Sequence, residues 1–147
     1  MPLKLKTDIS NTSETFSVGQ KQLVCLARAV LRSNRILVLD EATSNVDMRT
    51  DDFIQKALKQ RFRDYTIITI AHRLNTIADY DLVIVMDKGR VVEIGSPLQL
   101  MTNSPTDNTV TKSGVFAEMV KSTGDNAVNI FRLAKNKYNG QANTTKA

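Results

Sequence analysis

The chain contains 147 residues, of which 24% are charged and 41% hydrophobic, and its formal net charge is +5. This composition is typical of a globular domain, and no apolar run approaches the roughly 20 residues that a membrane-spanning helix requires. Because the basic residues are spread along predicted helices and only 5% of the residues are aromatic, no nucleic-acid-binding surface is expected. Residues Met1–Lys6 lack the apolar core of a secretory signal.

A helix is predicted to follow the segment Phe16–Gln20, because apolar residues recur at helical spacing from Leu23 to Val30. Ser17 is a suitable N-cap, and Gly19 allows the backbone to approach a ligand closely. A helix N-terminus with a hydroxyl and a glycine can bind phosphate. The alternative is that these two residues form a helix cap and nothing more.

The next predicted element is a strand over Ile36–Leu39, which is followed directly by two acids, Asp40 and Glu41. A short aliphatic run of this kind is typical of a strand buried on both faces of a parallel sheet. Ligands bind beyond the carboxyl ends of such strands, and two adjacent carboxylates there indicate a cation such as Mg²⁺. The alternative is that Asp40 caps the following helix and Glu41 lies in its first turn.

A second helix over residues 48–62 and a second buried strand over residues 66–71 follow along the chain. This strand ends at His72, which is the only histidine. A lone histidine at a strand end is more often a structural residue than a catalytic one, and this alternative stays open. If the two strands are parallel, His72 and Asp40 lie at the same edge of the sheet, which favours a functional role.

The rest of the chain predicts shorter elements and a tail. They are a helical segment near 75–78, strands over 82–86 and 90–93 joined by the turn 87–89, and helices over 97–101, 115–121 and 127–138. Residues 102–113 are polar and loop-like, and residues 139–147 are expected to be disordered. The alternation of strands and helices predicts an α/β fold.

Taken together, these segments resemble the nucleotide-binding domain of ATP-binding-cassette (ABC) transporters. Phe16–Gln20 is similar to the signature motif, and Ile36–Glu41 resembles the Walker B strand with its catalytic glutamate. Ser44–Asp47 resembles the D-loop, and His72 resembles the switch histidine. The form Phe-Ser-Val-Gly-Gln is similar to the second cassette of the C subfamily, the multidrug-resistance-associated proteins. The resemblance covers roughly residues 1–121.

The resemblance implies a partial P-loop NTPase (RecA-like) core, with a parallel sheet, helices on both faces and a C-terminal hairpin. It also implies ATP and Mg²⁺ as cofactors, with ATP held between two cassettes. Asp40 would anchor Mg²⁺, Glu41 would act as the general base, and His72 would contact the γ-phosphate and stabilise its developing charge. The cofactor-binding residues implied in this way are Ser17, Val18, Gly19, Gln20, Ser44 and Asp47.

The expected partners are a second cassette and the transmembrane domains of an exporter, at the cytoplasmic face of a membrane. Residues 1–121 are predicted to form the C-terminal portion of an ABC-type ATPase domain. Residues 122–147 are predicted to form a polar tail that is partly helical or disordered.

One family motif is absent from the 147 residues. No glycine is followed by Lys-Ser or Lys-Thr, so the sequence contains no Walker A loop to hold the β- and γ-phosphates. The chain is therefore expected to be inactive by itself, while its full-length parent is expected to hydrolyse ATP for transport. The alternative is a non-catalytic interaction module or inactive fragment. An ABC-type ATPase of chromosome maintenance or translation is disfavoured by the C-type signature.

Overall fold

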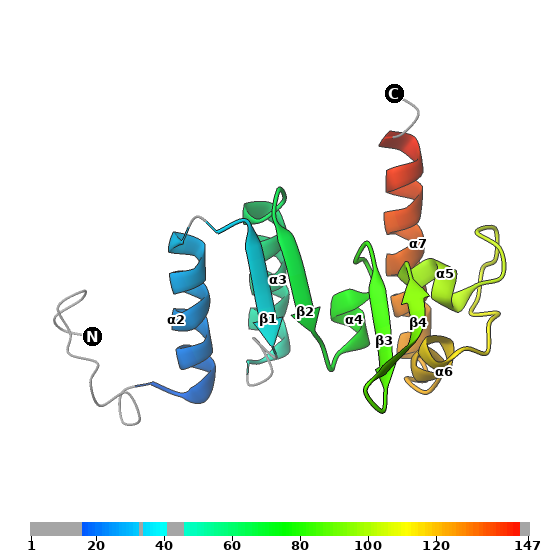
Figure 1. Ribbon diagram of the computed structural model, residues 1–147, viewed down its shortest axis with the longest axis horizontal. Helices are drawn as coiled ribbons and strands as arrows, with labels where there is room; N and C mark the ends of the chain where they lie inside the picture. The colour runs from blue at the N-terminus through cyan, green and yellow to red at the C-terminus, as the bar shows by residue number, and fades with distance from the viewer. Residues whose placement is uncertain (1–15, 33, 41–45, 145–147) are drawn as a thin grey trace, which may run out of the picture. The chain divides into compact units, whose positions relative to one another are not determined.

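The computed structural model describes residues 16–32, 34–40 and 46–144 (Figure 1). The chain divides into two compact units, Met1–Ile70 and Ala71–Ala147. Each unit combines helices with a two-stranded sheet, so the predicted α/β class is confirmed. Within the described part of the chain, none of the helices has the length and hydropathy of a membrane span.

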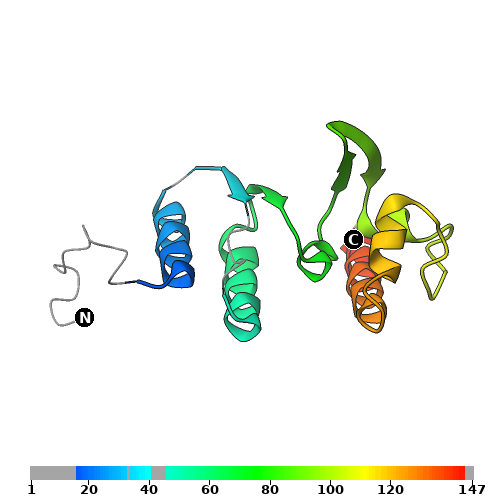
Figure 2. The same ribbon diagram turned by 90° about the horizontal axis from the view of Figure 1, so that it is seen from below.

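The described residues of the first unit form two helices and a parallel pair of strands. The strands pair in register from Ile36 opposite Thr66 to Asp40 opposite Ile70. Both helices lie on the same side of the strands (Figure 2). The elements in chain order are α2 (Val18–Leu31), β1 (Ile36–Asp40), α3 (Met48–Arg61) and β2 (Thr66–Ile70).

The core of the first unit lies between the two helices and one face of the sheet. The Phe62 and Tyr65 rings meet edge to face there, with their centroids 5.0 Å apart. The buried members of this core are Leu39, Val46, Ile54, Leu58 and Phe62, and the partly buried ones are Leu23, Leu26, Val30, Leu37, Tyr65 and Ile67. Alternate residues of β1 and β2 therefore point to the helices, as the period of two in a strand requires.

The opposite face of this sheet carries exposed aliphatic side chains. Ile36 and Val38 are each 62% exposed, and Ile68 and Ile70 are 53% and 54% exposed. The expectation of a β1 strand buried on both faces therefore does not hold for the described residues. The aliphatic run favours two-sided burial, but both helices of this unit pack on the same side.

The second unit, as far as Thr144, forms an antiparallel hairpin and four helices. The hairpin turn has Lys88 at φ 48° and Gly89 at φ 75°, which matches the two left-handed residues of a type I′ turn and the turn predicted from the sequence. The elements in chain order are α4 (Leu74–Ile77), β3 (Val83–Asp87), β4 (Arg90–Gly95), α5 (Pro97–Met101), α6 (Val115–Lys121) and α7 (Asn126–Thr144).

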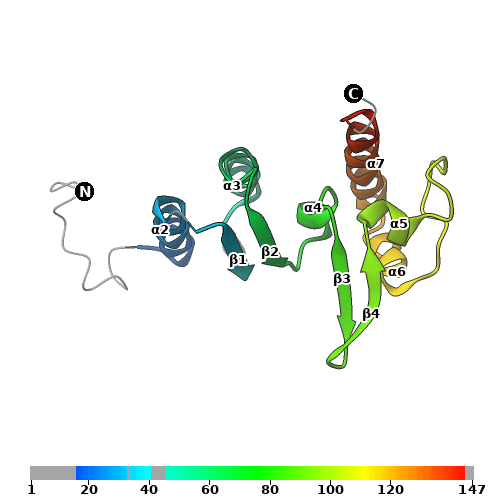
Figure 3. The ribbon, with the colours of Figure 1, turned by 45° about the horizontal axis from the view of Figure 1, so that its top comes forward.

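α7 packs against three other helices of the second unit. It contacts α4, α5 and α6, and it lies beside α4 (Figure 3). The helix extends to Thr144, beyond the predicted start of disorder at residue 139. Anchored helices propagate readily, because each added residue gains a hydrogen bond at small entropic cost. The predicted boundary between residues 1–121 and 122–147 stays a prediction.

One hydrophobic cluster joins these elements of the second unit. Phe116, Met101, Ile130 and Val120 are its largest fully buried side chains. The buried members are Ala78, Val83, Val85, Leu98, Leu100, Met101, Phe116, Val120, Ile130, Phe131 and Ala134.

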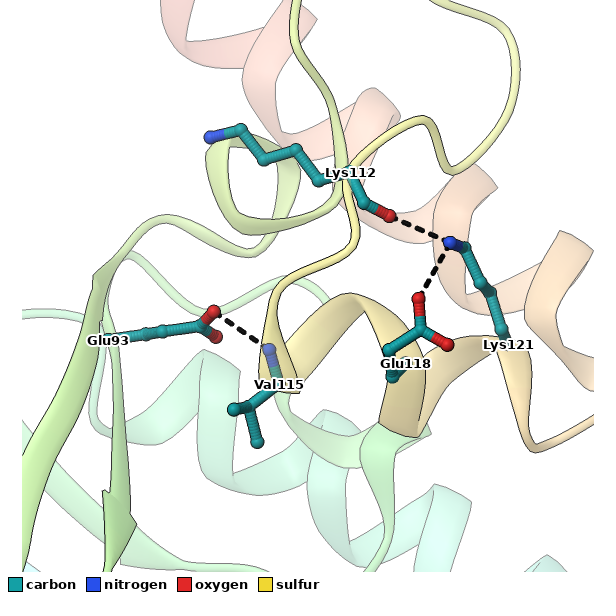
Figure 4. A network of polar contacts seen from close by, with 5 residues as sticks. All are labelled: Glu93, Lys112, Val115, Glu118 and Lys121. Atoms are coloured by element: carbon teal, nitrogen blue, oxygen red, sulfur yellow. Dashed lines mark hydrogen bonds and ion pairs between the residues drawn. The ribbon is translucent and has the colours of Figure 1, made fainter.

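α6 receives its N-terminal cap from a distant strand (Figure 4). The Val115 and Phe116 backbone N–H groups donate to the Glu93 carboxylate of β4, at 2.8 and 2.9 Å. Gly114 precedes the helix, and a Cβ at this position would overlap Glu93 Oε1. The absence of a side chain at Gly114 therefore lets the carboxylate reach the two N–H groups.

Candidate nucleotide-contacting site

The segment Phe16–Gln20 forms the N-terminus of α2. The Gln20 backbone N–H donates to Ser17 Oγ at 3.2 Å, and the Ser17 backbone N–H donates to Gln20 Oε1 at 3.0 Å. This reciprocal capping box confirms Ser17 as the predicted N-cap. Because its oxygen accepts this bond, the Ser17 hydroxyl can still donate its own hydrogen.

Exposure of this segment leaves it open to a ligand. Ser17, Val18 and Gln20 are exposed, and Gly19 is half-buried. The N-terminus of a helix carries a partial positive charge and favours anions. The Ser17 hydroxyl and the Gly19 backbone can therefore contact a phosphate group. The hydrogen bonds between Ser17 and Gln20 cap the helix at the same time.

Asp40 is the last residue of β1 and is exposed. The helix that follows is capped by Asp47, so the alternative in which Asp40 caps that helix is wrong. The carboxylate of Asp40 therefore stands at the carboxyl end of a parallel strand without a capping role. Glu41 and Ser44 lie outside the described residues.

Asp47 is the N-cap of α3. The Thr50 backbone N–H donates to Asp47 Oδ1 at 3.0 Å, and the Thr50 hydroxyl donates to Asp47 Oδ2 at 2.6 Å. The hydroxyl bond first, and the backbone bond next, hold the pKa of the Asp47 carboxyl below its usual value. An aspartate directly before a helical pattern is the sequence signal that could have predicted this cap.

His72 follows β2 and belongs to the second unit. Its side chain is exposed. In the strand register, Asp40 is opposite Ile70, two residues before His72. The expected approach of His72 to Asp40 stays a prediction.

The described carboxylates can be compared with the needs of Mg²⁺. Among the residues that the structure describes, no three His, Cys, Asp or Glu side chains are grouped as a metal site. Mg²⁺ commonly takes only one or two protein carboxylates and completes its octahedral shell with phosphates and water. The exposed carboxylate of Asp40 could therefore bind a Mg²⁺ ion whose other ligands are phosphate oxygens and water. Asp40 alone does not supply enough ligands for a metal site made of protein groups only.

A shallow cavity of about 260 Å³ lies in the first unit, away from Ser17. Its lining residues come from the C-terminal half of α2, the start of β1 and the end of α3. The sequence had suggested only solvated helix faces for the arginines in this set. The lining residues are Cys25, Arg28, Ala29, Arg32, Asn34, Ile36, Leu37 and Phe62.

The sequence matches a known family model and several curated proteins. The model described as ABC transporter matches residues 1–44. The chain is 59% identical over 124 residues to the Drosophila melanogaster "Probable multidrug resistance-associated protein lethal(2)03659", covering 84% of this chain and 8% of that protein. It is 48% identical over 124 residues to the Homo sapiens "ATP-binding cassette sub-family C member 4", covering 84% of this chain and 9% of that protein.

A Rattus norvegicus relative, "ATP-binding cassette sub-family C member 3", is 49% identical over 123 residues, which cover 84% of this chain and 8% of that protein. The chain thus spans less than a tenth of the length of these curated relatives. The fold is similar to "Structure of a bacterial Atm1-family ABC exporter with ATP bound". That match has a TM-score of 0.64 and 38% identity, and covers 74% of this chain and 18% of that chain.

Proposed function

We infer that this chain, which belongs to the ABC transporter family and is similar to members of its C subfamily, forms part of an ATP-hydrolysing exporter cassette. The observation that supports this most directly is the signature segment at the N-terminus of α2, where Ser17 is both exposed and a helix cap. The extent of the sequence matches favours a cassette over a non-catalytic interaction module.

In this proposal the signature segment contacts the γ-phosphate of ATP held by a second cassette. The Ser17 hydroxyl donates its remaining hydrogen to a phosphate oxygen. Gly19 permits close approach of the backbone, and the positive end of the α2 dipole attracts the anion. Val18 and Gln20 complete the contact surface, since both are exposed.

Asp40, at the end of β1, and Glu41, which follows it in the sequence, act at the phosphate of the chain's own cassette. Asp40 binds Mg²⁺, directly or through water, and Glu41 takes a proton from the attacking water as the general base. Mg²⁺, when bound with the nucleotide, would supply positive charge at its phosphates. His72 donates a hydrogen bond to the γ-phosphate as negative charge develops there. Asp47 couples the two ATP sites across the pair of cassettes, and Ser44 contacts the nucleotide.

We further propose a position for the cassette within an exporter. Its partners are a second cassette and transmembrane domains, and it works at the cytoplasmic face of a membrane. The signature form, Phe-Ser-Val-Gly-Gln over Phe16–Gln20, supports the second cassette of a C-subfamily transporter.

The test uses a full-length transporter that contains this sequence. Glu41→Gln is expected to lower phosphate release by about 10²–10⁴-fold while ATP binding persists, because glutamine keeps the shape and lacks the base. Asp40→Asn should instead weaken Mg²⁺-dependent ATP binding. Ser17→Arg should block hydrolysis at the site shared with the partner. Val24→Ala, on an exposed position of α2, is the control. Phosphate release within a few-fold of wild type for Glu41→Gln would contradict the proposed mechanism.

A second test uses the 147-residue chain alone. Because its sequence contains no Walker A loop, we expect no binding of Mg·ATP at micromolar concentrations. Isothermal titration calorimetry measures this directly. Micromolar affinity would show that the chain holds ATP by other groups, and would favour an independent nucleotide-binding module.

A further inference from the structure

α4 is the first element after His72, and it is too short to be stable by itself. It has four residues, Leu74–Ile77, and its N-cap Arg73 makes no side-chain hydrogen bond to it. Isolated helices shorter than about 12 residues are marginal in water. The conformation of this segment must therefore depend on packing against other elements.

α7 supplies an important part of that packing. Leu74 and Ile77 pack against the buried cluster that contains Ala78, Ile130 and Ala134. α4 and α7 are in contact, and they lie side by side in Figure 3. Ala78, the C-cap of α4, and Ile130 of α7 are both 0% exposed. A loss of volume at Ile130 would therefore loosen the surface on which α4 rests.

Two lysines of α7 contact neighbouring segments of the second unit. Lys135 Nζ donates to the Asp107 carbonyl and to Asn108 Oδ1, each at 2.7 Å, which ties α7 to the loop between α5 and α6. Lys137 Nζ lies 3.0 Å from Asp81 Oδ1. Asp81 follows α4 closely in the chain, so this ion pair connects α7 to the segment that leaves α4.

The position of His72 depends on that of α4, because the two are almost adjacent in the chain. The Cα atoms of His72 and Leu74 are at most about 7 Å apart, because only Arg73 lies between these two residues. A misplacement of about 1 Å, caused by a change far from the chemistry, can lower a rate by on the order of 10²-fold. We propose that α7 positions His72 through α4, and that Ile130 is the main positioning residue. This rests on the proposed function, in which His72 contacts the γ-phosphate.

The test compares two variants of α7 in the full-length transporter. Ile130→Ala is expected to lower kcat for ATP hydrolysis by about 5- to 100-fold and to change KM for ATP by less than about twofold. The matched control is Val128→Ala, because Val128 is β-branched, lies on the same helix and is 75% exposed. Ile130→Val keeps the branched side chain and should restore most of kcat.

Hydrogen–deuterium exchange provides a readout of the position of α4. In Ile130→Ala, exchange is expected to rise in the peptide covering residues 71–80 and to stay unchanged in the peptide of α2. If Ile130→Ala fails to fold, Lys137→Met serves instead, because it removes the ion pair with Asp81 without opening a core cavity. It should give a smaller change of the same kind in both kcat and exchange.

Two results would overturn the positioning role while leaving the proposed function intact. The first is an Ile130→Ala variant that exchanges faster over residues 71–80 but keeps its kcat, while His72→Ala in the same transporter lowers kcat. The other is an equal rise of exchange in both units, which would mark a general loss of stability. If His72→Ala itself leaves kcat unchanged, the role of His72 in the proposed function fails, and the positioning role fails with it.

Discussion

The two units of the chain differ in how they use their side chains. In the unit of residues 71–147, eleven buried residues form one cluster, whereas the described part of the other unit has five. No residue of α2 is buried, although α2 carries the signature segment. Of the exposed groups with predicted roles at ATP, Ser17 and Asp40 belong to the first unit and His72 belongs to the second.

Several charged side chains of the second unit form hydrogen bonds with backbone groups of the same unit. Glu93 accepts two backbone hydrogen bonds at the start of α6, and Lys121 donates to the Lys112 carbonyl at 2.8 Å (Figure 4). Lys112 Nζ in turn donates to the Gln99 carbonyl at 2.6 Å. A group that must meet a ligand or a partner has to stay at the surface, and such regions are drawn from the less stable part of a fold. The contrast is thus between the described part of the first unit, which holds Ser17 and Asp40 at its surface, and the second unit, which has the larger buried cluster.

The largest expected effect is on the free energy of unfolding of the second unit. Phe116→Ala should destabilise that unit by about 3–5 kcal/mol, because Phe116 is 1% exposed and its removal leaves a cavity. Native-state hydrogen exchange, followed by peptide, measures this unit by unit. The matched variant Leu58→Ala should speed exchange in the first unit only. If either variant changes both units equally, the two units unfold together and the contrast between them is lost.

A smaller effect is expected at the cap of α6. Glu93→Ala should cost about 1–3 kcal/mol, because it leaves the Val115 and Phe116 N–H groups without their acceptor. Gly114→Ala should destabilise the same helix, because the added Cβ overlaps Glu93 Oε1.

A double-mutant cycle of Glu93→Ala and Gly114→Ala, followed by urea unfolding, tests the shared cause. The double variant should lose less stability than the sum of the single variants, since the overlap needs both side chains. Full additivity would mean that Gly114 acts independently of the carboxylate.

The smallest effect is a pH dependence that the two units share. The pKa of Asp47 is lowered by its bonds to Thr50, and that of Asp107 is lowered first by the Thr111 hydroxyl and then by the Ser104 backbone N–H. A lowered pKa in the folded state adds stability above the unfolded pKa of about 3.9, and this stability is lost as the pH falls through the folded value.

Asp47→Asn is the variant that tests this linkage in the first unit. Asparagine is also a good N-cap but carries no charge, so α3 should persist and should lose less stability as the pH falls below the unfolded pKa of about 3.9. Asp107→Asn should weaken the response of the loop before α6 in the same way. Hydrogen exchange of the two segments at several pH values measures both. An unchanged acid response in Asp47→Asn would show that other carboxylates control α3.

Local signals in the sequence were enough to predict most helices and strands. Ser17 and the apolar spacing from Leu23 to Val30 predicted α2, and Gly89 predicted the hairpin turn. These features act within a few residues, so neither depends on the remainder of the fold. The extension of α7 beyond residue 138 was missed because its last turns are polar and propagate from a helix anchored at Ile130.

The sequence by itself determined the α/β class, the order of elements and the resemblance that assigns roles to residues such as Ser17 and Asp40. Only the tertiary structure decided which face of β1 is covered, and that Glu93 caps a helix 22 residues away at Val115. The physical reason is the distance along the sequence over which each kind of interaction acts. Backbone propensity and capping depend on neighbours within one turn, whereas burial and long-range hydrogen bonds depend on segments that only the packed chain brings together.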